Sequence, residues 1–159
     1  MINNMLQNRA VAITIKGDEV LLMFRRKNGK EYFTFPGGGV EDGESVEQAT
    51  IREIKEETTL DIKIEKLLYH HIYDNKQEQF FYLCSYLSGD PRLSSDSIEA
   101  QRLSDDNFYQ PQWHKITDLP QMLVYPLEIR DWLVEDIKNG FTNTPKEAKI
   151  KISDIRRNL

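Results

Sequence analysis

The 159-residue sequence predicts an α/β fold, in which a central mixed sheet has one helix on each side. Three observations lead to this prediction: short strand-like runs on both sides of residue 50, a helical stretch that begins near Ser45, and a second one that begins at Pro126. The length is that of one domain, and 39% hydrophobic with 30% charged residues is typical of a soluble globular protein with a buried core.

The first 35 residues are expected to form strands. Residues 9–16 (RAVAITIK) and 19–24 (EVLLMF) are rich in β-branched and apolar side chains, and Gly17-Asp18 between them suits a hairpin turn. A basic group, Arg25 to Lys27, follows the second run. Such a group is typical of a solvated loop. As an alternative, Arg25 leaves its strand close to a glycine run and could supply positive charge to a substrate phosphate or position a base.

The glycine run follows Pro36 and consists of Gly37, Gly38 and Gly39. Residues without a Cβ atom let backbone N–H groups approach a ligand closely and adopt positive φ, so we expect a turn here that lies next to substrate phosphates. A helix is predicted after it, because Ser45 stands three residues before Gln48, the spacing of a capping box. This helix should run to about residue 58.

Three carboxylates share one face of the predicted helix. At roughly 100° per residue, Glu53, Glu56 and Glu57 project within an arc of about 100° near the helix C-terminus. Their repulsion costs a few tenths of a kcal/mol per pair, and they oppose the helix dipole. Mg²⁺, which takes oxygen ligands from a few carboxylates and from substrate phosphates, would offset this cost. A solvated acidic face is the alternative, but the adjacent glycine run favours nucleotide or diphosphate chemistry.

The same stretch resembles the signature of a known family. Gly38, Glu44 and the run from Arg52 to Leu60 (REIKEETTL) are spaced as in the Nudix hydrolases, whose pattern is Gly-x5-Glu-x7-Arg-Glu-apolar-x-Glu-Glu-x-Gly-apolar. Eight of the nine specified positions agree. The exception is Thr59, where the pattern has a glycine that ends the helix in a left-handed conformation. A β-branched residue accepts that conformation badly, so we expect a slightly altered helix exit and an unchanged metal face.

The resemblance to MutT-like Nudix hydrolases implies an α/β/α sandwich and Mg²⁺-dependent hydrolysis of a diphosphate linkage in a nucleoside diphosphate bonded to another moiety. Glu53, Glu56 and Glu57 would then hold Mg²⁺ or Mn²⁺, with water as the nucleophile. Arg52 points away from the centre of the carboxylate arc, so we assign it to an ion pair with Glu44 or a nearby carboxylate, which the resemblance also supports.

Residues 89–107 combine serines with acidic residues and predict a long mobile loop, and loops of this length are often functional. In Nudix enzymes a loop at about this point frequently contributes another metal ligand or the general base. We select Glu99 for this role, with a plain solvated loop as the alternative. Glu53 is the other candidate for the general base.

The second half of the chain is expected to complete the sheet. Residues 60–69 alternate between apolar and polar, and residues 79–87 are more continuously apolar. Together with Gln112-Trp113-His114, which we interpret as a short strand, they predict three strands. Residues 126–138 have apolar side chains at helical spacing, begin with proline and end before Asn139-Gly140. They predict a helix that packs on the sheet.

We predict a catalytic Nudix-type domain over residues 1–138 and a basic tail over residues 139–159. The tail contains five basic and two acidic residues, whereas the whole chain has a net charge of −5. A basic tail on an acidic body favours docking onto its own domain or contact with a partner subunit, and a disordered extension is equally consistent with it. A homodimer is suggested only by the resemblance, because dimers are common among Nudix proteins.

Composition argues against several other classes. The net charge of −5 disfavours broad nucleic-acid binding, and the absence of an 18-residue apolar run or a leader-like start makes a cytoplasmic protein without a membrane segment the expectation. The expected ligand is a nucleotide-type small molecule: a nucleoside triphosphate, a nucleotide sugar or a dinucleoside polyphosphate. A catalytically silent nucleotide-binding or sensor domain, and an interaction module that works through the tail, are the alternatives.

Overall fold

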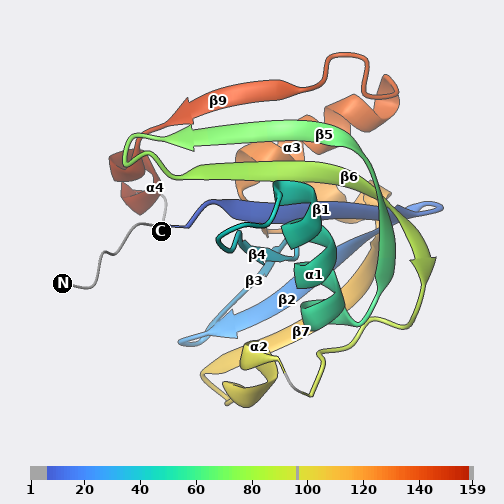
Figure 1. The fold of residues 1–159 in the computed structure, drawn as a ribbon, viewed down its shortest axis with the longest axis vertical. Helices are drawn as coiled ribbons and strands as arrows, with labels where there is room; N and C mark the ends of the chain where they lie inside the picture. Colours follow the sequence, from blue (N-terminus) through green and yellow to red (C-terminus); the bar gives the residue numbers. More distant parts are fainter. Residues whose placement is uncertain (1–6, 96, 158–159) are drawn as a thin grey trace.

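Figure 1 shows the fold as a computed structural model, in which residues 7–95 and 97–157 are described, except for the side chains of residues 98, 99, 156 and 157. A curved mixed sheet forms the middle layer. Helix α1 (Val46–Thr58) covers one face of the sheet and α3 (Leu127–Lys138) covers the other. The predicted α/β/α sandwich with a central mixed sheet is confirmed.

The strands are β1 (Arg9–Lys16), β2 (Glu19–Lys27), β3 (Lys30–Thr34), β4 (Gly37–Gly39), β5 (Asp61–Tyr73), β6 (Glu78–Ser88), β7 (Asn107–Lys115), β8 (Val124–Tyr125) and β9 (Lys146–Ile150). The strand order is β8-β3-β2-β1-β6-β5-β9, while β4 pairs with β1 and β7 pairs with β2. Three pairs are parallel, namely β1 with β6, β3 with β8 and β5 with β9. The sheet is therefore mixed, because its remaining pairs are antiparallel.

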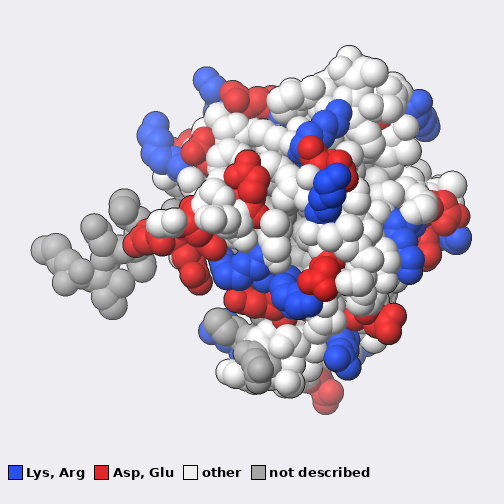
Figure 2. Space-filling view, turned by 45° about the vertical axis from the view of Figure 1, so that its right-hand side comes forward, with Lys and Arg blue, Asp and Glu red and all other residues white. Residues whose placement is uncertain are grey.

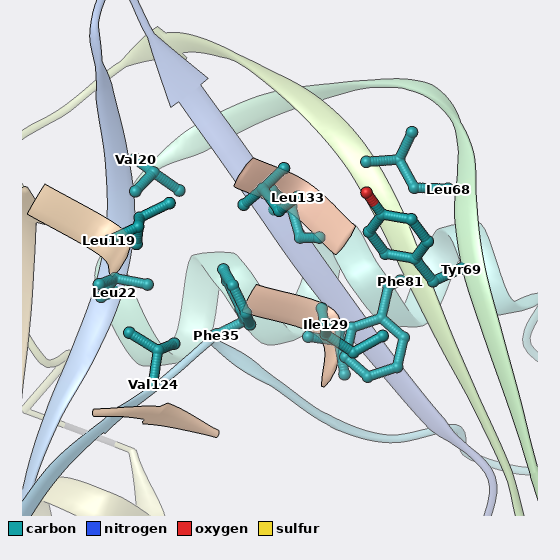
Figure 3. Close-up of a cluster of buried hydrophobic side chains, with 12 residues drawn as sticks. Val20, Leu22, Phe35, Leu68, Tyr69, Phe81, Leu119, Val124, Ile129 and Leu133 are labelled. Atoms are coloured by element: carbon teal, nitrogen blue, oxygen red, sulfur yellow. The ribbon is translucent and has the colours of Figure 1, made fainter. Parts of the chain in front are cut away.

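Alternation along the central strands divides the core into two layers. In β1, Val11 and Ile13 point toward α3, whereas Ala12 between them points toward α1. Figure 3 shows the larger layer, where Ile129 and Leu133 of α3 meet side chains from the sheet. Ile54 and other buried residues of α1 pack in the second layer, so α1 lies on the sheet with its polar face outward.

Helix α1 begins with the predicted capping box. The Gln48 N–H donates to Ser45 Oγ over 3.1 Å, and the Ser45 N–H donates to the Gln48 side chain over 2.9 Å. Two of the unpaired donors of the first turn are thereby satisfied. The start of the helix that carries the carboxylates was therefore readable from local sequence alone.

The helix exit differs from the expectation. Thr59 adopts the left-handed conformation itself, with φ 64° and ψ 3°, and its N–H donates to Lys55 O over 3.0 Å. The expectation of an altered exit is therefore wrong. The Thr59 hydroxyl donates to Asp90 O over 2.9 Å, and the Arg92 N–H donates to Thr58 O over 3.0 Å. These contacts with the segment after β6 hold Thr59 in a conformation that its side chain disfavours.

Replacement of Thr59 tests this balance. Both Thr59→Gly and Thr59→Ala lose the hydrogen bond to Asp90, but only Gly relieves the left-handed strain. We expect Thr59→Gly to be more stable than Thr59→Ala by about 1 kcal/mol, the usual cost of a Cβ atom in this conformation. Urea unfolding of the two variants measures the difference, and equal stabilities would show that Thr59 is not strained.

The glycine run is a strand instead of the predicted turn. Gly37, Gly38 and Gly39 form β4, pair antiparallel with β1, and none has positive φ. Glycine is needed at these positions because the neighbouring groups pack closely. A Cβ atom on Gly37 would collide with the β1 backbone, and one on Gly38 would collide with the Glu53 carboxylate. Missing side chains therefore bring α1 and β4 together, which is a different reason from the conformational freedom that we expected.

Residues 89–107 contain more regular structure than the predicted loop. A short helix, α2 (Ile98–Gln101), lies within them, and β7 begins at Asn107, five residues before the predicted strand. All of β7 pairs with β2, from Lys115 opposite Glu19 to Asn107 opposite Lys27. The η1 turn (Ile116–Gln121) then leads to β8 and α3. The early start of β7 has a functional consequence, because it brings Tyr109 beside Arg25.

The segment after α3 docks onto the domain over part of its length. Strand β9 adds to the sheet parallel to β5, and α4 (Ile152–Arg157) follows it. Lys146 Nζ lies 2.7 Å from Oδ1 of Asp136, a fully buried residue of α3, and Tyr69 donates to the other Asp136 oxygen over 2.8 Å. This ion pair fixes the start of β9 against the core.

In the part of the chain that the structure describes, no helix combines the length and apolar character needed to cross a membrane.

Candidate active site

Arg52 is the centre of a carboxylate network on the outer part of α1. Its guanidinium donates to both oxygens of Glu44, with distances of 3.0 and 2.6 Å, and to Gly39 O over 2.9 Å. The predicted pairing of Arg52 with Glu44 is present. The prediction that Arg52 points away from the carboxylate arc is only partly right, because Nη1 also contacts Glu53 over 2.9 Å and Glu56 over 3.3 Å. A long flexible side chain reaches groups that its Cβ direction does not face.

The network also sets the protonation of Glu44. Hydrogen bonds from Arg52, with a further one from the Glu41 N–H, lower the pKa of Glu44 from 4.5 to about 2. A lowered folded-state pKa means that the ionised form stabilises the fold. This contribution is fully present above the unfolded-state pKa and is lost as pH falls from about 4.5 toward 2.

Glu44→Gln should therefore change how stability depends on pH. We expect the free energy of unfolding of the variant to fall less steeply than that of the unmodified protein between about pH 5 and pH 2, because the proton uptake by Glu44 is removed. Urea unfolding at half-unit pH intervals gives the slope. Glu31→Gln is the matched control, because it removes a carboxylate on β3 that is paired with a different arginine, Arg26. Parallel pH curves for the Glu44 variant and the unmodified protein would contradict the assignment.

Glu57 is the most enclosed of the three arc carboxylates. It is only 8% exposed, and Oε2 accepts a hydrogen bond from the Gly37 N–H over 3.2 Å. Glu53 packs against Gly38, where the missing Cβ leaves room for its carboxylate. Strand β4 thus orients two of the three predicted metal ligands. Glu56 is more open, with 54% of its side chain exposed.

The carboxylates of Glu53, Glu56 and Glu57 are the candidate ligands of a metal ion. Among the side chains that the structure describes, no three His, Cys, Asp or Glu residues are arranged as metal ligands. The Arg52 guanidinium lies against Glu53 and Glu56. The donors themselves fit a hard divalent cation, because they are carboxylate oxygens on adjacent turns of one helix. The missing side chain of Gly38 makes room for one of them, the Glu53 carboxylate. A cation would replace the guanidinium as the positive charge between these carboxylates.

A small cavity lies beside Glu57. Its volume is about 130 Å³, and its lining residues are Arg9, Met23, Arg25, Thr34, Phe35, Pro36, Gly37, Glu57 and Tyr109. A larger hollow of about 480 Å³ on the outside of α1 is bounded only by side chains of that one helix. The smaller cavity is the candidate substrate site, because residues of β1, β2, β3, β4, α1 and β7 line it and one of them is a candidate metal ligand.

Arg25 brings positive charge to this cavity. Its guanidinium carbon lies 3.6 Å above the Tyr109 ring centre, and Nη2 donates to Asn107 over 3.4 Å. Its Nε is buried and has no hydrogen-bond partner among the described residues. A buried N–H without an acceptor is costly and suits a site where a ligand oxygen provides one.

Sequence reasoning missed Arg9 and Tyr109 as cavity residues. Arg9 opens β1 opposite Gly39, and Tyr109 is opposite Arg25 in the β2–β7 register. No local pattern distinguishes either from an ordinary strand residue, so only strand pairing could find them. The backbone of Glu99 lies in α2, but its side chain is outside the described residues, and its predicted role stays a prediction.

Charges of both signs are interspersed around this region. Figure 2 shows Lys and Arg beside Asp and Glu over the visible face, with no continuous basic area. At the cavity itself, Arg9 and Arg25 are the lining residues that supply positive charge.

Comparison with known proteins agrees with this fold. The model of the NUDIX domain matches residues 5–133. The chain belongs to this family, which is the class that the mixed sheet and the acidic helix define. No further subdivision of the family follows from the match alone.

Among curated relatives, the ADP-ribose pyrophosphatase of Methanocaldococcus jannaschii is 36% identical over 58% of this chain and 60% of its own length. A putative nudix hydrolase of Caenorhabditis elegans is 29% identical over 94% of this chain, which spans only 40% of that relative. The chain therefore covers less than two thirds of both. The uncharacterized Nudix hydrolase YvcI of Bacillus subtilis is 28% identical over 81% of this chain and 82% of its own length.

Solved structures show the same fold. A NUDIX hydrolase from Nitrosomonas europaea superposes with a TM-score of 0.70 at 18% identity, covering 91% of this chain and 78% of that structure. At this identity the likeness establishes the fold alone.

Proposed function

We propose that this protein hydrolyses a diphosphate linkage in a nucleoside diphosphate bonded to another moiety, with Mg²⁺ as the cofactor and Mn²⁺ as a substitute. The observation that carries the proposal is the position of Glu57: a nearly buried carboxylate in the wall of a cavity that also contains Arg25. Relatives named ADP-ribose pyrophosphatase, dihydroneopterin triphosphate diphosphatase and RNA pyrophosphohydrolase support cleavage of diphosphate bonds.

Each side chain has a separate task in this proposal. Glu53, Glu56 and Glu57 hold the cation, which when bound neutralises phosphate oxygens and lowers the pKa of water. Arg52 keeps Glu44 and the upper part of α1 in place. Either Glu53 or Glu99 accepts the proton of the attacking water. Gly37 to Gly39 let the substrate phosphates lie close to β4.

Arg25 is proposed as the residue that binds a substrate phosphate. Stacking on Tyr109 holds the guanidinium at the cavity before a ligand arrives, and the unpaired Nε is left to donate to a ligand oxygen. The candidate substrates are nucleoside triphosphates, nucleotide sugars and dinucleoside polyphosphates. Each carries a phosphate oxyanion next to the scissile bond, which Arg25 would bind. Since these compounds are found inside cells, we place the activity in the cytoplasm.

Arg25→Ala should lower kcat/KM by about 10- to 100-fold, which corresponds to the loss of one or two charged hydrogen bonds. Arg26→Ala is the matched control, because Arg26 is the next residue on β2 and pairs with Glu31 away from the cavity. Steady-state kinetics of both variants, with melting temperatures to check folding, make the comparison. Equal kinetics for the two variants would remove Arg25 from the site.

Phosphate release from a panel of nucleotides and nucleotide conjugates tests the function as a whole. Each compound is incubated with Mg²⁺ and with EDTA, and coupling to pyrophosphatase or phosphatase identifies the bond that breaks. Metal-dependent turnover of one compound is the expected result and names the substrate class. If no compound is turned over but one raises the melting temperature, the protein is instead a catalytically silent nucleotide-binding domain.

A further inference from the structure

Strand β9 is an open edge of the sheet. It is the last strand in the order and contacts β5 on one side only, and Figure 1 shows it as the outermost strand. The family match ends at residue 133, so this edge is built by a segment outside the part of the chain that the family model covers. Open strand edges present unpaired main-chain donors and acceptors and are ready to pair with another strand.

The main-chain groups that face outward belong to two residues. Ile150 O accepts a hydrogen bond from the Asp74 N–H, so the main chain of Ile150 faces β5. Direction alternates along a strand, so Lys146 and Ala148 also face β5, whereas Glu147 and Lys149 face outward. Within the described residues no main-chain partner is found for these two, and both side chains are exposed.

We propose that β9 pairs antiparallel with β9 of a second copy of this chain, about a two-fold axis at Ala148. In this register Glu147 of each copy is opposite Lys149 of the other, and Lys146 is opposite Ile150. The two residues with outward main-chain groups are then the ones that form hydrogen-bonded pairs. Ala148, the smallest side chain of the strand, meets its own copy at the closely spaced central pair.

Charge selects the same register. Residues directly opposite on antiparallel strands lie on one face, so the pairing places two Glu147 to Lys149 ion pairs across the axis. The nearest registers that keep outward main-chain groups opposite each other are shifted by two residues, and they set Glu147 opposite Glu147 or Lys149 opposite Lys149, which are like charges. The lysine that would discourage edge pairing with an unrelated strand therefore finds an acidic partner in a second copy.

The pairing does not depend on the proposed hydrolysis and should be weak. Five residues on each side bury far less than the area of about 1,200 Å² above which specific complexes are usually stable. We expect half-dimerisation at about 100 µM, in the range of weak and transient complexes. The interface joins the two sheets into one continuous sheet.

Charge exchange tests the pairing with the full chain. Glu147→Lys and Lys149→Glu should each weaken dimerisation at least tenfold in sedimentation equilibrium over about 10 µM to 1 mM, the range set by the expected affinity. The double variant E147K/K149E should restore it, because the opposite charges again face each other. Glu147 also lies 3.3 Å from His70, a contact that the exchange does not restore, so recovery in the double variant reports on the interface and not on the monomer.

Lys149→Pro provides a second test. It removes an outward N–H for which the described residues provide no acceptor, so β9 should stay docked while dimerisation is lost. Amide hydrogen exchange adds a local readout: the Glu147 and Lys149 amides should gain protection as the concentration rises, and the Ala148 amide should be protected throughout. A chain that stays monomeric to 1 mM, a Pro variant that dimerises normally, or a double variant without recovery would each overturn the proposal.

Discussion

Glu57→Gln is expected to reduce turnover of the substrate by on the order of 10²–10³-fold, the usual effect of removing one preorganised electrostatic group. The fold should remain intact, because the amide oxygen of Gln can still accept the hydrogen bond from the Gly37 N–H. Stability should hold or rise, since the change removes one charge from an acidic helix face. Steady-state kinetics across a Mg²⁺ titration, together with melting temperatures, measure both effects.

The matched control is Glu135→Gln, which makes the same chemical change at an exposed position of α3, on the other side of the sheet. Turnover by this control should equal that of the unmodified protein. If Glu57→Gln has full activity at every Mg²⁺ concentration, the carboxylate face of α1 is not the metal site. If its activity recovers fully at high Mg²⁺, Glu57 contributes to metal affinity but not to the chemical step.

Lys146→Met is expected to have the largest effect on stability, a loss of about 3 kcal/mol. Asp136 is fully buried, and Lys146 Nζ at 2.7 Å is the positive charge that compensates it. Removing that charge leaves a buried carboxylate with only the Tyr69 hydroxyl as a hydrogen-bond donor among the described residues. Urea unfolding gives the loss directly.

Asp136→Asn in the same chain separates the ion pair from packing. The double variant D136N/K146M should recover a large part of the stability, because the uncompensated charge is gone and Asn can still accept from Tyr69. Lys151→Met is the control, because Lys151 is exposed and follows directly after β9. It should change stability by less than about 0.5 kcal/mol. Additive losses in the double variant would mean that Asp136 and Lys146 do not interact energetically.

Features that depend on neighbours in sequence were predictable. The capping box at Ser45, the strands 9–16 and 19–24 and the helix that ends before Asn139 are all set by propensity and periodicity over a few residues. The grouping of Glu53, Glu56 and Glu57 on one helix face follows from the 3.6-residue repeat. These features required no knowledge of what packs against them.

Features that depend on long-range packing were not predictable, and three were misjudged. The glycine run is a strand, because β1 hydrogen-bonds to it and Glu53 fills the space beside Gly38. Thr59 adopts the left-handed conformation, and the hydrogen bond that its hydroxyl donates to the main-chain oxygen of Asp90 holds it there. Strand β7 starts early, because β2 offers a continuous edge. In each case the decisive contact lies tens of residues away in sequence, where local propensity carries no information.

The sequence by itself determined the family, the α/β class and the helix that carries the acidic face, since spacing along the chain is enough to specify them. Only the tertiary structure decided which side chains share a site. The β2–β7 register brings Tyr109 to Arg25, β4 brings the Gly37 N–H to Glu57, and the sheet edge at β5 accepts the C-terminal strand. The physical reason is that strand pairing and core packing join groups far apart in the chain, and each such contact depends on all the others.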